Sequence, residues 1–223
     1  MELFHVLNRG VDKRTIFQDD KDRFRFVHDL FEFNDQNIVN TTSYYFNQSY
    51  DIASRKIERK PRKLLVDIHA FCLMRNHYHL LLSSKVEKGI PQFMKKLNMG
   101  YAKYFNGKYK RTGALFEGRY KSIFIEKESH FLHLPYYIHL NPLDYYDPDW
   151  RDNKIKDYKK TLSYLKNYRW SSLLDYMGRA NFPSLIQKDF LSEVIGKPEN
   201  YEKSLVGWLK DRDNSDLTDI SLE

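Results

Sequence analysis

Two apolar segments in the middle of the chain constrain its fold most strongly. Residues 64–74 and 77–83 are mostly apolar, and only two residues stand between them. Short apolar runs with polar boundaries are typical of buried strands, and a connection this tight joins antiparallel neighbours. The sequence therefore predicts a β-hairpin at this point.

The second segment carries a His-x-His pair. Side chains alternate along a strand, so His77 and His79 would share one face while Tyr78 lies on the other. Two imidazoles whose Cα atoms are about 6–7 Å apart can bind one divalent metal ion. An isolated pair is more often satisfied by neighbouring hydrogen bonds, so the pair alone leaves both interpretations open.

The segments around the hairpin predict an α+β fold. We expect a strand over residues 3–7, a helix from Asp19 or Asp20 to about residue 33, a helix over 89–107 and a strand over 121–126. The order strand–helix–strand–strand–helix–strand is that of a ferredoxin-like antiparallel sheet with helices on one face. The first and third strands are then central, which places the two histidines at mid-sheet.

Periodic apolar residues indicate which face of each helix is buried. The first helix has Phe24, Val27 and Phe31 at helical spacing. The second helix has a longer stripe, made of Phe93, Leu97, Tyr101 and Tyr104 or Phe105.

The length of 223 residues suits one domain with an appendage. We expect an α+β domain over residues 1–145, with a polar insertion at about 34–63, and a helical extension over 146–223 packed on that domain. The insertion ends in a basic run at 55–63, which is more often a solvated surface than a DNA contact.

Charge indicates the class of partner. The formal net charge is +7 and the pI is near 9.2, which favours an anionic partner, with nucleic acid ahead of a membrane surface. No signal peptide or membrane-length apolar run is evident, and the single cysteine, Cys72, excludes an intramolecular disulfide. We therefore predict a cytoplasmic protein that does not bind membranes.

Residues 95–127 mix basic with aromatic side chains. Basic groups neutralise phosphates and aromatic rings stack on unpaired bases, a combination that suits single-stranded nucleic acid. For Tyr101 and Tyr104 a position in the core is the better interpretation, whereas the segment 118–122 is a candidate DNA contact.

A third helix, around residues 131–142, carries a candidate nucleophile. Tyr137 and Asn141 are four residues apart and share one helix face. Beside a metal site, a phenolate could attack a phosphodiester whose phosphate the metal polarises. A lone helical tyrosine is more often a core or surface residue, and Pro135 can kink the helix, which leaves Tyr136 as an alternative.

Four sequence blocks resemble the single-tyrosine HUH transposases, specifically the REP-associated tyrosine transposase branch of the IS-element transposases. The blocks are HVLNRG at 5–10, CLMRNHYHLLL at 72–82, FEGRYKS at 116–122 and YIHLNP at 137–142, with a weaker echo, YRWSS, at 168–172. Four blocks in this order are far more specific than a His-x-His pair. The resemblance implies an HUH-endonuclease type of fold.

The resemblance also implies a mechanism. In such enzymes the two histidines, here His77 and His79, bind Mg²⁺ or Mn²⁺ with a polar residue of the tyrosine helix, here Asn141. The tyrosine that matches the nucleophile is Tyr137, which would cut single-stranded DNA, often beside a hairpin, and become a 5′-phosphotyrosine. The free 3′-OH could later reverse the step on another strand, so the enzyme would act as a transposase.

The remaining polar residues receive lesser roles. Arg9, Arg119 and Lys121 would contact phosphates, and Tyr120 would stack on a base. We expect His139 to point away from the site on its helix. The other histidines are expected to be structural or solvent-facing: His5, His28, His69, His130 and His133.

Two other functions stay open at this point. A sequence-specific DNA hairpin-binding protein of the same descent would keep these residues without cutting. A metallohydrolase of small phosphoesters would need a closed pocket, which the open basic face disfavours. The chain could act as a monomer or as a homodimer.

Overall fold

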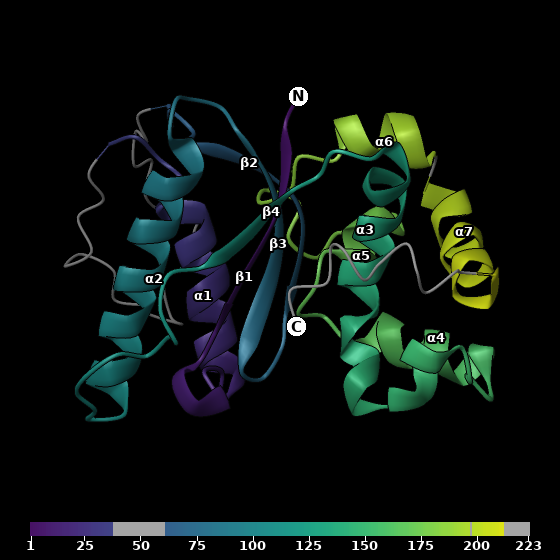
Figure 1. Cartoon of the computed structure of the whole chain (residues 1–223), viewed down its shortest axis with the longest axis horizontal. Helices are drawn as coiled ribbons and strands as arrows, with labels where there is room; N and C mark the ends of the chain where they lie inside the picture. Colours follow the sequence, from purple (N-terminus) through teal and green to yellow (C-terminus); the bar gives the residue numbers. More distant parts are fainter. Residues whose placement is uncertain (38–60, 197, 212–223) are drawn as a thin grey trace, which may run out of the picture.

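The centre of the molecule is a four-stranded antiparallel sheet. The computed structural model describes residues 1–37, 61–196 and 198–211. The strands are β1 (Leu3–Arg9), β2 (Val66–Leu73), β3 (His77–Ser84) and β4 (Lys121–Phe124), in the order β2-β3-β1-β4 (Figure 1). The predicted α+β fold with central first and third strands is confirmed. Most of the predicted polar insertion and its basic run lie outside the described residues, as do residues 212–223.

The register of the sheet decides which side chains share the histidine face. In the β1–β3 pair, Arg9 is opposite His77, Leu7 is opposite His79 and His5 is opposite Leu81. Directly paired residues point to the same side of an antiparallel sheet. The face that carries the His-x-His pair therefore also carries alternate residues of β1, starting with His5.

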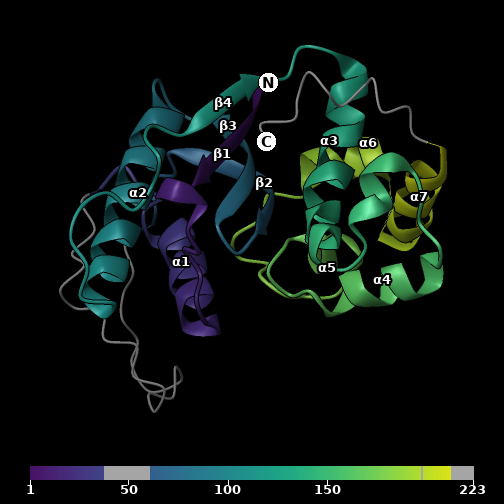
Figure 2. The ribbon, with the colours of Figure 1, turned by 60° about the horizontal axis from the view of Figure 1, so that its bottom comes forward.

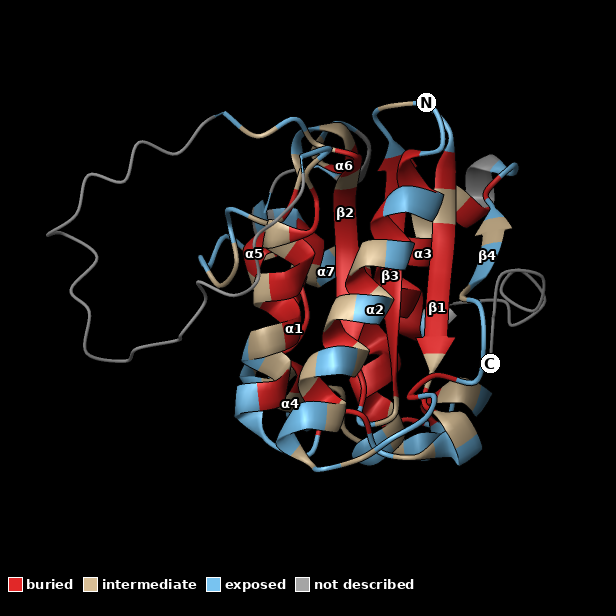
Figure 3. Ribbon diagram, turned by 90° about the vertical axis from the view of Figure 1, so that its left-hand side faces the viewer, coloured by how far each residue is buried: buried red, intermediate tan, exposed pale blue. Residues whose placement is uncertain are grey.

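The opposite face is covered by α1 (Asp20–Glu32) and α2 (Gly89–Lys108) (Figure 1). Tyr78 points into this layer, where its ring lies 4.7 Å from that of Phe26. Seen from this side, β1, β2 and β3 are largely buried and β4 forms a more exposed edge (Figure 3). The predicted buried stripe of α2 is confirmed, with Phe93, Leu97, Tyr101 and Phe105 all in the core.

The predicted stripe of α1 is confirmed at Val27 and wrong at Phe24. Phe26, Val27 and Leu30 are buried, whereas Phe24 is 37% exposed. Phe24 packs edge-on against Trp170 of the C-terminal extension, with ring centroids 4.9 Å apart. An aromatic residue that packs on a distant part of the chain can have the same helical spacing as one that packs in the core. Periodicity alone could therefore not show that Phe24 belongs to the first kind.

The histidine face is covered by the rest of the chain, on the side away from α1 and α2 (Figures 1 and 2). This layer begins with α3 (Glu128–Leu140) and two 3₁₀ turns, η3 (Asn141–Tyr145) and η4 (Pro148–Asp152). It continues with four helices: α4 (Tyr158–Asn167), α5 (Leu173–Tyr176), α6 (Asp189–Ile195) and α7 (Pro198–Asp211).

The extension also covers the outer edge of β2. The Leu73 amide donates to the Trp170 carbonyl (2.9 Å) and the Ser172 amide to the Phe71 carbonyl (3.0 Å). Unpaired strand edges invite association with other chains, and here the extension satisfies part of that edge. The helices of the described residues include none that is both long and apolar enough to cross a membrane.

Candidate active site

Three buried imidazoles lie on the covered face of the sheet. His79 is fully buried, and its Nδ1 is 3.0 Å from Nε2 of His5, with the two rings stacked at a centroid distance of 5.2 Å. His77 is 7% exposed, and its Nδ1 is 2.7 Å from Oδ1 of Asn76. The rings of His77 and His79 have centroids 5.0 Å apart. Because Nδ1 is engaged in both His77 and His79, these two residues would bind a metal ion through Nε2.

His5 is a residue that sequence reasoning missed as part of this site. It was expected to be structural or solvent-facing, and it is a buried hydrogen-bond partner of a candidate metal ligand. For His79 to ligate through Nε2, its Nδ1–H must donate to His5. Such partners orient a ligand and increase its basicity.

Tyr137 of α3 meets these rings edge-on. Its ring centroid is 6.0 Å from that of His79 and 6.1 Å from that of His5, and its side chain is 2% exposed. Tyr136 instead packs against Tyr201, with centroids 5.2 Å apart. Of the two adjacent tyrosines, Tyr137 therefore lies beside the histidines.

Pro135 does not start the tyrosine helix, since α3 runs through it from Glu128 to Leu140. His139 points away from the site, as expected. Its Nδ1 is 2.6 Å from the Tyr201 hydroxyl and its Nε2 is 2.7 Å from the Ser172 hydroxyl, both in the extension. Burial lowers the pKa of His139 to about 3, so its ring is neutral.

Asn141, the proposed third ligand, is fully buried just after α3. Its amide nitrogen donates to the Tyr137 carbonyl (2.9 Å). Its amide oxygen accepts from Nη2 of Arg151 (3.2 Å), and Nη1 of the same guanidinium lies 3.4 Å from the Tyr137 hydroxyl. Arg151 is anchored in turn by Asp144, at 2.7 and 2.9 Å. Neither Arg151 nor Asp144 was predicted from the sequence.

The donor set suits a divalent cation with open coordination positions. Within the described ranges, no three His, Cys, Asp or Glu side chains are placed to hold a metal ion. A site here would rest on His77, His79 and the Asn141 oxygen, which has a second lone pair beside its bond to Arg151. Imidazole nitrogens and an amide oxygen can together bind a divalent metal ion, with the other positions left for water and phosphate.

The three predicted phosphate contacts line one cavity of about 200 Å³ beside β1 and β4. Arg9 and Lys121 face it from the strands, and Arg119 from the segment before β4. The Arg9 Nε is buried and has no hydrogen-bond partner among the described residues. Tyr120 is half-buried against the core, and burial raises the pKa of its phenol.

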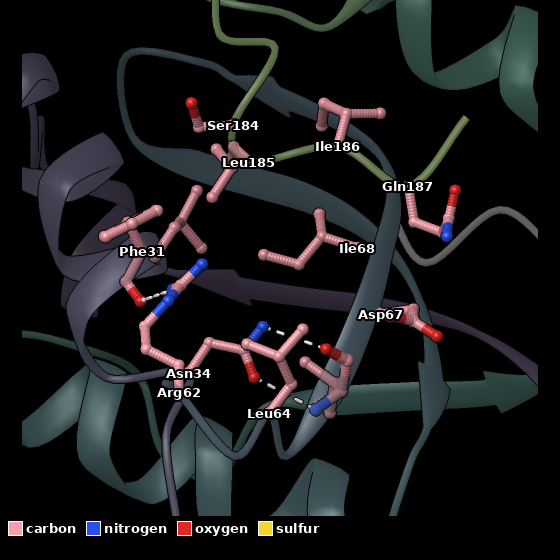
Figure 4. Close-up of a pocket in the computed structure, with 12 residues that line it drawn as sticks. Phe31, Asn34, Arg62, Leu64, Asp67, Ile68, Ser184, Leu185, Ile186 and Gln187 are labelled. Carbon is pink, nitrogen blue, oxygen red and sulfur yellow. Dashed lines mark hydrogen bonds between the residues drawn. The ribbon is translucent and has the colours of Figure 1, made fainter. Parts of the chain in front are cut away.

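A second cavity of about 200 Å³ lies between α1, β2 and residues 184–187 (Figure 4). Its polar groups already serve the fold. The Asn34 side chain bonds to the backbone of Leu65 and Val66, and Arg62 donates to the Phe31 carbonyl. We therefore assign the chemistry to the histidine face.

Comparison with known proteins finds a family match over part of the chain. Residues 38–141 match the family model described as "Transposase IS200 like". This match confirms, over these residues, the resemblance to that family seen in the sequence blocks.

Among solved structures, the chain matches a REP-associated tyrosine transposase bound to a REP hairpin. The identity is 12%, the TM-score is 0.43, and the match covers 84% of this chain and 86% of the other. No curated protein matches the chain.

Proposed function

We propose that this chain is a metal-dependent transposase of the REP-associated tyrosine branch. It would cleave and rejoin single-stranded DNA near hairpins through a 5′-phosphotyrosine. The observation that carries this proposal is the position of Tyr137, edge-on against His79 and His5 on the face that also holds His77. The family match over residues 38–141 supports the reaction class.

His77 and His79, through Nε2, and the Asn141 amide oxygen would hold Mg²⁺ or Mn²⁺. When bound, the ion would polarise the scissile phosphate. Tyr137 Oη forms a bond to phosphorus as the P–O3′ bond breaks, its phenol proton passes to water, and the leaving 3′ oxygen takes up a proton.

The DNA backbone would cross the cavity lined by Arg9, Arg119 and Lys121. This cavity borders the site, because Arg9 is the strand partner of His77. Three cations at one place favour consecutive phosphates, and a single strand can present these at short spacing. We propose this path for the strand that enters the site.

We propose that the extension from residue 146 onward completes the domain of residues 1–145 and is required for folding. Its backbone pairs with β2, and its Ser172 and Tyr201 bond to His139 of α3. Whether the complete chain acts alone or as a homodimer can be tested by light scattering with and without DNA. The single cysteine of the chain, Cys72, is buried and forms no disulfide, which is compatible with a reducing compartment such as the cytoplasm.

The proposal is tested with hairpin oligonucleotides labelled at the 3′ end and incubated with protein and Mn²⁺. A phosphotyrosine retains the 3′ fragment, so the label should migrate with the protein on a denaturing gel. EDTA, Tyr137→Phe and His77→Ala should each abolish the adduct. An adduct that persists in Tyr137→Phe and disappears in Tyr136→Phe would assign the nucleophile to the neighbouring residue.

One observation favours a second function, that of a hairpin-binding protein without cleavage. The Tyr137 side chain is only 2% exposed, so a scissile phosphate needs an opening to reach Oη. Tight hairpin binding with no adduct under Mg²⁺ or Mn²⁺ would support this function instead.

A further inference from the structure

The guanidinium of Arg151 touches both proposed functional groups of the tyrosine helix. Nη1 donates to Tyr137 Oη at 3.4 Å, and Nη2 donates to Asn141 Oδ1 at 3.2 Å. Nε and Nη2 also bond to the two carboxylate oxygens of Asp144, at 2.9 and 2.7 Å. The three partners are Tyr137, Asn141 and Asp144, which follow one another at spacings of four and three residues. They therefore lie along one helical face, and a single planar guanidinium contacts all three.

Arg151 is held in a defined geometry. Asp144 Oδ1 also accepts from Nε1 of the buried Trp150, at 2.7 Å. The Arg151 Cζ lies 4.9 Å from the centre of the Trp150 ring and 5.6 Å from that of Tyr137. Bidentate arginine–carboxylate pairs fix the orientation of the guanidinium. The Arg151–Asp144 pair is partly exposed, so its contribution to the stability of the fold is small.

Position in the sequence sets Arg151 apart from the matched family region. That region ends at residue 141, whereas Asp144 and Arg151 lie in the two 3₁₀ turns that follow it. These turns fold back so that η4 returns to the end of α3, where the guanidinium reaches the tyrosine.

We propose that Arg151 is a catalytic residue that stabilises negative charge on Tyr137 Oη. The same guanidinium fixes the position of the Asn141 amide oxygen relative to Tyr137. This inference rests on the proposed function. In the forward step the donor stabilises the phenolate that forms the bond to phosphorus. In the reverse step the 3′ oxygen forms that bond, the Oη–P bond breaks, and the same donor stabilises the departing phenolate.

The test is single-turnover adduct formation with the full chain at saturating hairpin oligonucleotide and Mn²⁺. Arg151→Gln should slow the first-order rate by about 10²–10³-fold, the usual loss when one donor to a developing charge is removed. Arg151→Lys keeps the charge without the planar fork and should fall between this variant and the wild type. Arg169→Gln is the matched control, because this exposed arginine stacks on the rings of Phe24 and Trp170.

Asp144→Asn separates catalysis from folding of the turns. It removes the anchoring carboxylate but leaves the guanidinium, so it should retain a higher rate than Arg151→Gln. If Arg151 only holds η4 in place, the two variants should lose rate and melting temperature in parallel. The dissociation constant for DNA is measured alongside, and Arg151→Gln should leave it within about threefold, because the proposed DNA path runs over Arg9, Arg119 and Lys121.

Three outcomes overturn the inference: an unchanged rate in Arg151→Gln, a loss confined to DNA affinity, or parallel losses in the Arg151 and Asp144 variants. The proposed function fails in a different way. Without a wild-type adduct, or with an adduct that survives Tyr137→Phe, it is rejected, and the role of Arg151 is rejected with it.

Discussion

Protonation of His139 should destabilise the fold in mild acid. The ring lies between α3 and the extension, with the Ser172 and Tyr201 hydroxyls on its two nitrogens and the Tyr176 ring beside it. Burial lowers its pKa to about 3, and burial also lowers the pKa of His69 to about 4. In the unfolded chain both histidines become protonated near pH 6.5. In the folded chain protonation requires a lower pH, near the pKa values given above.

The sign and size of the effect follow from this difference. Stability is fully present above about pH 6.5 and is lost as the pH falls towards the folded-state pKa values. A shift from 6.5 to about 3 corresponds to roughly 4–5 kcal/mol for His139 across the whole window. Near pH 5 each of the two histidines contributes a slope of about 1.2–1.3 kcal/mol per pH unit, or about 2.5 together.

Urea unfolding at several pH values between about 4.5 and 7 measures this slope. His139→Gln keeps hydrogen-bonding capacity and removes the titration, so it should be less stable at pH 7 but lose about half of the slope. His133→Gln removes a half-buried histidine from the same helix and should change the slope less. A wild-type slope near zero, or one that His139→Gln leaves intact, would refute the reasoning.

Three other perturbations should give distinct results. His5→Ala should weaken Mn²⁺ binding by about 10–100-fold in a calorimetric titration, because His79 loses the partner that orients it, and unchanged affinity would reject that role. Asp22→Ala should cost roughly 1–3 kcal/mol in urea unfolding, since this buried carboxylate pairs with Lys108 and accepts from two tyrosine hydroxyls; an unchanged stability would contradict this account. Lys121→Ala should weaken single-stranded DNA binding and lower the log–log salt slope by about 0.7, and an unchanged slope would remove it from the DNA path.

The sheet and one helix face could be predicted because local patterns dictate them. The tight connection between residues 74 and 77 defines the β2–β3 hairpin, and the spacing from Phe93 to Phe105 follows the α2 core. The adjacency of β1 and β3 was also predicted. Alternation along β1 could then have placed His5 on the histidine face, so the signal existed and was not used.

Arg151 could not be predicted in the same way. Its contact with Tyr137 spans fourteen residues and depends on how η3 and η4 turn back, which no periodicity encodes. The stripe on α1 failed for a related reason, because Phe24 packs on Trp170, far along the chain. Contacts that irregular segments make between distant positions cannot be predicted from the periodicity of a single sequence.

The extension does more than cover the sheet, because it determines which tyrosine of α3 faces the histidines. Residues two apart on a helix point roughly in opposite directions, so His139 and Tyr137 lie on different sides of α3. Tyr201 and Ser172 engage His139, and Tyr201 also packs on Tyr136, which together oppose rotation of α3 about its axis. Rotation by one residue would bring Tyr136 towards His79 and carry Tyr137 away. The position of the proposed nucleophile is thus set by side chains on the far side of its helix, outside the region that matches the transposase family.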